Sequence, residues 1–251
     1  MIHPKFELLL ISAFISTFAA AGGWAMTSKV AGHAAGNACF VILMAMALPV
    51  LALQLLLSHA SPTRLIYTIA YQATVACTFT LFLCALLFPA YWIPAVDLGP
   101  KIAVSLFVVL LSCWSFGRGL RAFRATWAAR GDALLAKHCR DGVNATAWSK
   151  LMLALNPSDG RLLPGLNDLG SALVAIAAFL SWMLGNALNT TFPTASLYAW
   201  IPFPALFIAY FIGAAGIRVG EILKLRAIEA ATGTRILPGQ HPTRRGRRAL
   251  R

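Results

Sequence analysis

Charged residues are scarce in this sequence, and acidic residues are the scarcest of all. Only 8 of the 251 residues are aspartate or glutamate, and charged residues of either sign make up 12% of the chain, against 59% hydrophobic residues. A typical soluble domain carries about 25% charged residues. The composition therefore excludes an ordinary soluble domain and predicts a protein that lies in lipid.

The sequence also lacks the motifs that carry a reaction, a metal or a cofactor. Its five histidines are scattered through expected loops and tails, and its five cysteines form no C-x-x-C pair. There is no G-x-S-x-G turn of a hydrolase, no H-E-x-x-H metal helix and no phosphate-binding Gly-Lys-Ser/Thr loop. Metal and haem sites need several ligands close together. We therefore expect no catalytic residues, no metal and no cofactor.

Acidic residues are missing from the middle of every apolar stretch. Seven of the eight fall at predicted cytoplasmic ends or in cytoplasmic segments, and Asp97 falls in a predicted outer loop. Proton-coupled and sodium-coupled transporters usually keep ionisable groups at bilayer depth, where such groups are costly and therefore functional. This absence argues against a driven transporter.

Long apolar runs are what the sequence has in abundance, and six of them are candidates to cross the hydrocarbon core, for which a helix needs about 20 residues. Because the runs are continuously apolar, they favour helices over the alternating strands of a barrel. The fourth run is the shortest, but Lys101 and Arg118 at its ends can extend their charged heads toward the two interfaces. We predict an all-α, polytopic membrane helix bundle. The predicted spans are residues 6–24, 38–58, 65–87, 102–116, 169–188 and 197–217.

The first run admits a second interpretation. Lys5, the apolar stretch from Leu8 and the small residues 19–21 also fit a cleavable signal peptide. Glu7 and the length of the apolar stretch favour a retained helix. Both alternatives leave the rest of the topology unchanged.

Basic residues are distributed unevenly between the loops, and this predicts the orientation. Lysine and arginine are retained on the cytoplasmic side during insertion. With a cytoplasmic N-terminus, 19 of the 21 basic residues lie inside, and only Lys29 and Lys101 lie outside. The outer connections around Lys29, Asp97 and Pro193 are expected to have roughly ten residues each, too few for a folded domain. We therefore predict cytoplasmic N- and C-termini and a bacterial inner membrane.

Two cytoplasmic segments are expected to be amphipathic helices. Large apolar residues recur on one helical face from residue 120 to residue 134, which predicts an amphipathic continuation of the fourth span. The pattern returns from Trp148 to Leu155, before the turn-forming residues 156–160. Two interpretations remain: a docking platform for a soluble subunit, or helices that lie flat among anionic headgroups. The candidate residues for contact with a partner or with lipid are Arg118, Arg121, Arg124, Trp127, Arg130 and Trp148, joined in the tail by Arg244, Arg245, Arg247 and Arg248.

The C-terminal segment begins as a helix and ends as a basic tail. The helix is expected to continue to about Thr232 and to stop at Gly233. Residues 241–251 are basic without apolar periodicity, which predicts a disordered tail attracted to lipid phosphates. No aromatic residue lies among these arginines to stack on bases, so the tail does not indicate a nucleic-acid partner.

Uncharged polar residues inside the spans are candidates for a solute path. They are Tyr67, Tyr71, Thr74 and Thr78, which share one face of the third span, and Asn186 in the fifth. The alternative is hydrogen bonding between helices, at about 0.6 kcal/mol for each bond. Small residues at four-residue spacing in the sixth span predict close packing, within one chain or in a homo-oligomer. Pro202 and Pro204 indicate either a bend or the start of a helix.

The predicted organisation has four parts. They are a four-span membrane region (1–117), a basic amphipathic cytoplasmic segment (118–168), a two-span hairpin (169–217) and a basic C-terminal helix with its tail (218–251). We expect a non-catalytic membrane subunit of a larger inner-membrane assembly for transport or secretion, with cytoplasmic or membrane protein subunits as partners. The alternative is a self-contained channel or facilitator for a small solute, which needs no buried charge.

Overall fold

The computed structural model describes residues 4–60, 64–139, 143, 145–156, 168–188, 191–233 and 236. These residues form helices and contain no strand, which confirms the all-α prediction. The helices are α1 (Pro4–Ala31), α2 (His33–Ala60), α3 (Leu65–Tyr91), α4 (Leu98–His138), α5 (Ala145–Leu155), α6 (Asp168–Leu188), α7 (Pro193–Trp200) and α8 (Pro202–Thr232).

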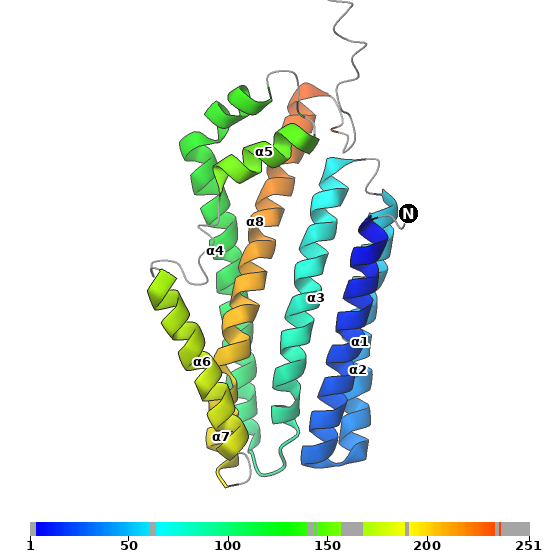
Figure 1. Cartoon of the computed structure of the whole chain (residues 1–251), viewed down its shortest axis with the longest axis vertical. Helices are drawn as coiled ribbons and strands as arrows, with labels where there is room; N and C mark the ends of the chain where they lie inside the picture. Colours follow the sequence, from blue (N-terminus) through cyan, green and yellow to red (C-terminus); the bar gives the residue numbers. More distant parts are fainter. Residues whose placement is uncertain are drawn as a thin grey trace, which may run out of the picture.

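The long helices stand side by side (Figure 1). α1 packs on α2 and both pack on α3, while α3 packs on α8 and α8 packs on α4. α6 lies against α7 and α8, at the edge of the bundle opposite α1 and α2. α5 crosses one end of the bundle. The first residues of α1 and the last residues of α8 lie at this same end.

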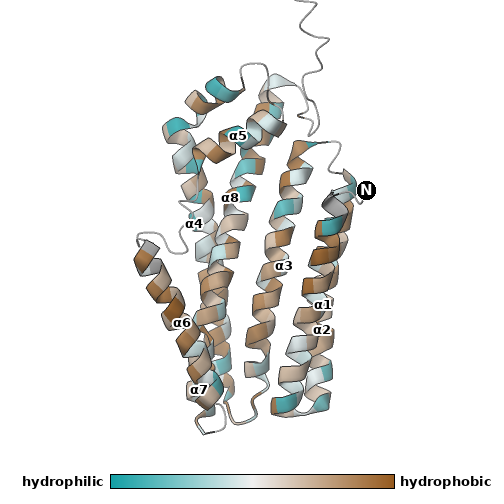
Figure 2. Cartoon of the chain, in the orientation of Figure 1, coloured by the Kyte–Doolittle hydropathy of each residue, from teal (hydrophilic) through white to brown (hydrophobic). Residues whose placement is uncertain are grey.

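The exterior of the bundle is apolar along much of its length. Phe14 and Leu110 are 70% and 67% exposed, and hydrophobic residues dominate the long helices in Figure 2. A soluble bundle would turn such residues toward its core, so these helices are compatible with an integral membrane protein. α6 has a shorter apolar stretch, Ala172–Leu188. Five described segments are long and apolar enough to cross a membrane: residues 7–31, His33–Ala60, Leu65–Tyr91, Leu98–His138 and Pro193–Thr232.

The connection between α1 and α2 is much shorter than the sequence indicated, and the prediction of about ten connecting residues around Lys29 is wrong. α1 continues through Lys29, and Gly32 alone separates α1 from α2. The φ angle of Gly32 is 87°, in the left-handed region that glycine adopts without steric cost. Nearby, Trp24 Nε1 donates a hydrogen bond of 2.9 Å to Asn37 Oδ1 across the two helices. Residues 25–37 lie between the predicted apolar runs, but a helix that has begun extends through such residues at little cost.

α4 extends far beyond the predicted span of residues 102–116. It has 41 residues, and at 1.5 Å per residue it is about 60 Å long, roughly twice the thickness of a hydrocarbon core. The helix passes through the predicted division between residues 117 and 118 without a break. The apolar stretch and the basic segment therefore belong to one continuous helix, which confirms the predicted amphipathic continuation of the fourth span.

The predicted sixth span is divided in two. α7 ends at Trp200 and α8 begins at Pro202, within the predicted span of residues 197–217, and the whole segment Pro193–Thr232 is long and apolar enough to cross a membrane. A proline nitrogen has no hydrogen to donate, and it therefore fits the first turn of a helix, where that hydrogen has no intrahelical partner. Pro202 stands in the first turn of α8 and the chain bends at Ile201 just before it, so the start of a helix and a bend coincide here.

Small residues bring α4 and α8 into close contact. A Cβ atom on Gly119 would lie 2.0 Å from the carbonyl oxygen of Gly213, a distance that no pair of non-bonded atoms can adopt. Ala205 and Ala209 are buried on the same helix as Gly213. The predicted role of these small residues in close packing is confirmed within a single chain.

Candidate functional site at the α5 end of the bundle

Three elements form a packed unit at one end of the molecule (Figure 1). We call it the α5 platform; it comprises residues 118–138 of α4, all of α5, and residues 218–232 of α8. The predicted amphipathic faces of α4 and α5 are confirmed, because their apolar residues are buried against each other, α8 and α3. The buried residues are Phe123, Trp127, Trp148, Leu151, Leu155 and Leu225, together with Leu65, Ile66, Ile69 and Ile236.

Two tryptophans form the centre of the α5 platform. The rings of Trp127 on α4 and Trp148 on α5 stack with centroids 5.8 Å apart. Each indole N–H has an acceptor: Trp127 Nε1 donates to Asp132 Oδ1 at 3.1 Å, and Trp148 Nε1 donates to Glu221 Oε1 at 2.7 Å. Leaving a buried indole N–H without an acceptor is unfavourable, and these two bonds avoid that cost.

Glu221 joins α5 to α8. Its carboxylate is almost completely buried, with the residue 2% exposed. One carboxylate oxygen accepts the bond from Trp148, and the other accepts a bond of 2.8 Å from Arg218 Nη1, one helical turn earlier on α8. A buried carboxylate is tolerated because both of its oxygens are engaged by donors, one of them charged.

Two further basic residues support the α5 platform from α4 and α8. Arg130 Nη2 donates a hydrogen bond to the carbonyl oxygen of Leu155, the last residue of α5. The last carbonyls of a helix have no partner within the helix, so this bond satisfies one of them. Lys224 Nζ lies 4.8 Å from the ring centroid of Trp127 and 3.9 Å from Asp132 Oδ1. Each contact joins different helices of the platform, so its helices are held in fixed relative positions.

The predicted contact residues of the α5 platform differ in their exposure to the surroundings. Arg121 and Arg124 are exposed on the outer side of α4, as a contact with a partner or lipid requires. Trp127 and Trp148 are only 7% and 2% exposed, so they hold the platform together and present no contact surface themselves. Their bulk and apolar character make the interior their favoured place. The predicted tail residues Arg244, Arg245, Arg247 and Arg248 lie outside the described residues.

A cavity of about 630 Å³ lies beside the α5 platform, between α3, α5 and α8. Its lining is mixed, with Gln72, Asn156 and Arg218 among apolar residues. Its volume is within the range of about 300–1,000 Å³ that is typical of small-molecule sites. Because both oxygens of Glu221 in its wall are already hydrogen-bonded, the cavity offers amide and guanidinium groups but no free carboxylate from Glu221.

The predicted polar path is not assembled in one place. On α3, Tyr71, Thr74 and Thr78 are buried at helix contacts, and Tyr67 is partly buried. Thr78 Oγ1 accepts a hydrogen bond of 3.0 Å from Gln54 Nε2 of α2, and Thr74 Oγ1 donates to the carbonyl oxygen of Tyr71 at 2.7 Å. The bond from Gln54 to Thr78 is of the kind that the alternative predicts, hydrogen bonding between helices, whereas the bond from Thr74 to Tyr71 lies within α3.

Asn186 lies apart from the polar residues of α3. It belongs to α6, which stands at the other edge of the bundle from α1 and α2 (Figure 1). Its Nδ2 donates to the carbonyl oxygen of Trp182, one turn earlier on the same helix, at 3.1 Å. The structure therefore does not bring Asn186 together with the tyrosines and threonines of α3.

The described residues supply little that could react or hold a metal ion. Among them, no three His, Cys, Asp or Glu residues are grouped closely enough to bind a metal. Burial against the platform raises the pKa of the Cys139 thiol, because the thiolate would lose its hydration. Cys139 is therefore a protonated, weakly nucleophilic thiol at neutral pH.

Sequence reasoning missed the role of Glu221, which it placed only at the end of a span. The spacing of Arg218 and Glu221 was a signal, because residues three apart lie on the same face of a helix. The pairing with Trp148 joins residues 73 positions apart, and no local pattern predicts it.

Comparison with other proteins gives no further guidance to this site. No protein-family model matches the sequence, and no curated protein and no solved structure shows significant similarity to it.

Proposed function

We propose that this chain is a non-catalytic, six-span subunit of a larger inner-membrane assembly of the transport or secretion type. In this proposal both termini lie in the cytoplasm, and the α5 platform is the surface on which partner subunits dock. The observation that carries the proposal is the platform itself, a packed unit at one end of the bundle with exposed arginines on its outer side.

The packing of the α5 platform supports docking over the alternative in which its helices lie flat on the membrane. A surface-bound amphipathic helix buries its apolar face among lipids. Here Trp148, Leu151 and Leu155 of α5 are buried against protein. The exposed side of α5 then presents Ser149 and Lys150, together with the exposed Leu153, for contact with a soluble or membrane partner.

Length and charge support six spans and cytoplasmic termini. α6 has 21 residues, which correspond to about 31 Å of helix and match a hydrocarbon core of about 30 Å. Counting α6 as a span in addition to the five long apolar segments gives six spans and leaves both chain termini on one side. That side would hold 19 of the 21 basic residues, as the positive-inside rule favours.

The alternative proposal, a self-contained channel or facilitator, has less support. Its candidate path residues Tyr71, Thr74 and Thr78 are buried at helix contacts, and Asn186 lies on a helix at the far edge of the bundle. Purified protein in liposomes tests this alternative. A flux of ions or small neutral solutes above the rate of empty vesicles would favour the channel over the subunit.

Gentle extraction from native membranes tests the subunit proposal. We expect a protein partner to co-purify in near-stoichiometric amount with the tagged chain. The double substitution Arg121→Gln and Arg124→Gln removes two exposed charges of the α5 platform and should release that partner. Mass spectrometry of the purified complex measures the ratio of partner to chain.

Lys29→Gln is the matched control, because Lys29 is an exposed basic residue at the opposite end of the bundle. The control should retain the partner. Recovery of the chain alone, or equal release of the partner by Lys29→Gln, would contradict docking on the α5 platform.

A further inference from the structure

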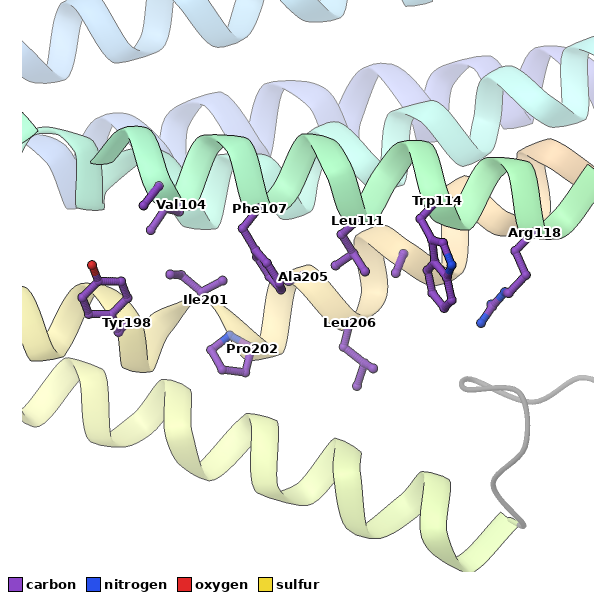
Figure 3. A pocket seen from close by; sticks show the side chains of 12 residues that line it. Val104, Phe107, Leu111, Trp114, Arg118, Tyr198, Ile201, Pro202, Ala205 and Leu206 are labelled. Atoms are coloured by element: carbon purple, nitrogen blue, oxygen red, sulfur yellow. The ribbon is translucent and has the colours of Figure 1, made fainter. Parts of the chain in front are cut away.

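An apolar groove runs along α4 and the α7–α8 segment and reaches the α5 platform at Arg118 (Figure 3). Its volume is about 510 Å³. Phe107 and Leu111 of α4 form one wall, and Ile201 and Leu206 contribute to the other. From Val104 to its charged end the groove follows about four turns of α4, or about 21 Å. This is somewhat longer than one leaflet of hydrocarbon, about 15 Å.

Among the described residues that line this groove, Arg118 is the one with a charged side chain, and it lies at one end of the row of labelled side chains in Figure 3. Its guanidinium carbon lies 5.0 Å from the ring centroid of Trp114, which holds the group against the groove wall. Its Nη1 is buried and has no hydrogen-bond partner among the described residues. A buried donor without an acceptor is unfavourable, more so when it is charged. An anionic occupant of the groove would supply the acceptor.

The other arginines near this end of the bundle do not need such an occupant. Arg218 is paired with Glu221, and Arg130 donates to the carbonyl oxygen of Leu155. Arg121 is exposed, so water can solvate it. Arg118 differs from all three because it combines a buried, unpaired donor with an adjoining apolar groove.

We propose that this groove binds one acyl chain of an anionic phospholipid whose phosphate pairs with Arg118. The site rests on the membrane placement given in the proposed function, in which Arg118 follows the predicted span 102–116 and lies at headgroup level. A phospholipid of that leaflet has its charged headgroup at one end and its acyl chains toward the midplane. The groove has the same order, with Arg118 at one end and apolar side chains along the rest. The planar guanidinium offers two parallel donors to phosphate oxygens.

The charge of Arg118 favours a lipid over a second protein chain as the occupant. An apolar helix would cover the walls formed by Phe107 and Leu206 but would leave the guanidinium unpaired. Anionic lipids are concentrated at the cytoplasmic leaflet, and they are attracted to basic residues there. A phospholipid therefore satisfies the apolar walls and the buried donor together.

Native mass spectrometry of the full-length protein tests the site. The protein is equilibrated in detergent with equal amounts of phosphatidylglycerol and phosphatidylethanolamine. We expect wild-type protein to retain one phosphatidylglycerol in preference to phosphatidylethanolamine. Arg118→Gln should lower the phosphatidylglycerol affinity about tenfold, the loss expected for one charge-assisted hydrogen bond. Lys29→Gln, which removes an exposed basic residue outside the α5 platform, is the control and should bind like wild type.

A second variant tests the groove independently of charge. Ala103 is an exposed residue of the groove lining, so Ala103→Phe adds bulk where an acyl chain would lie and leaves the buried core untouched. This variant should bind both lipids more weakly. Arg118→Lys should keep part of the preference for phosphatidylglycerol, because it retains the charge but loses the planar pair of donors. Circular dichroism and thermal unfolding establish that each variant is folded.

Equal retention of the two lipids by wild type, or unchanged binding by Arg118→Gln, would overturn the lipid site. A dimer that Ala103→Phe converts to a monomer would also overturn it, because a second chain would then occupy the groove. The two proposals fail separately. A chain that alkaline carbonate extracts from membranes contradicts the membrane placement, whereas an embedded chain without lipid preference contradicts the groove site alone.

Discussion

The two halves of α4 expose opposite kinds of side chain. In the half that contains the predicted span, Phe107 is 51% exposed and Leu110 is 67% exposed. In the half that belongs to the α5 platform, Phe123 is 2% exposed, and the exposed positions include Arg121 and Arg124. In the first half of α4 the exposed side chains are therefore apolar, whereas in the second half the apolar side chains are buried.

This inversion is compatible with two solvents, lipid and water, and with a different way of holding helices together in each. In lipid, apolar burial drives no association, so helices gain stability from close approach, as where Gly119 meets Gly213. In water, burial of large apolar residues is the main stabilising term. The α5 platform buries Trp127, Trp148 and Leu151 accordingly.

The sharpest test of this comparison places the same substitution in each half of α4. Phe123→Ala removes a buried ring that packs against Trp127 and Gly220, and we expect a loss of about 4 kcal/mol in the free energy of unfolding. Phe107→Ala removes an exposed ring and should cost less than about 1 kcal/mol. Reversible unfolding of both variants in the same mixed micelles measures the difference. Equal losses would contradict the proposed division of α4 between two solvents.

The glycine contact between α4 and α8 should be nearly as sensitive. Gly119→Leu places a Cβ atom 2.0 Å from the carbonyl oxygen of Gly213, so the two helices must separate, at a cost of about 3 kcal/mol. Gly117→Leu is the control, since a Cβ atom there meets nothing within 4 Å. The midpoint of thermal unfolding should fall for the first variant and stay level or rise for the second. An unchanged midpoint for Gly119→Leu would show that α4 and α8 can separate at this contact without a loss of stability.

A smaller effect is expected at the polar centre of the α5 platform. Glu221→Ala leaves the buried Trp148 N–H without an acceptor and should cost about 2 kcal/mol. Glu221→Gln keeps an acceptor for Trp148 but loses the charge opposite the half-exposed Arg218, so it should cost only about 1 kcal/mol. Tryptophan fluorescence during unfolding follows both variants. Equal losses would mean that the ion pair, rather than the indole bond, dominates this contact.

The smallest effect concerns reactivity. Because burial raises the pKa of Cys139, a smaller fraction of this thiol is ionised at neutral pH than of an exposed thiol. In a protein whose other cysteines are replaced by alanine, maleimide should label Cys139 several-fold more slowly at pH 7 than a cysteine at the exposed position of Ser149. The two rates should converge as the pH rises above both pKa values. Equal rates at pH 7 would place Cys139 in water.

Local patterns predicted local features of the fold correctly. The turn-forming residues after Leu155 predicted the end of α5, where Asn156 has a left-handed φ of 40°. Gly233 was predicted to end the last helix, and it caps α8 with a φ of 66°. These predictions succeeded because backbone preferences at a helix end depend on only a few neighbouring residues.

Features that depend on distant residues escaped prediction. The hydrogen bond from Trp148 to Glu221 requires α5 to fold back onto α8, and the groove at Arg118 requires α4 and α8 to lie side by side. Hydrophobic periodicity predicts which face of a helix is buried, but it does not predict which other helix packs on that face.

The continuity of α4 has a mechanical consequence. A helix of about 60 Å behaves as a stiff rod, so a tilt of about 10° around its midpoint moves each end by about 5 Å in opposite directions. The groove at Arg118 adjoins this rod near its middle, and the α5 platform is fixed to its far half. A ligand that pushes α4 away from α8 at this groove would therefore also move the half of α4 that belongs to the α5 platform, because no break in the helix separates the two.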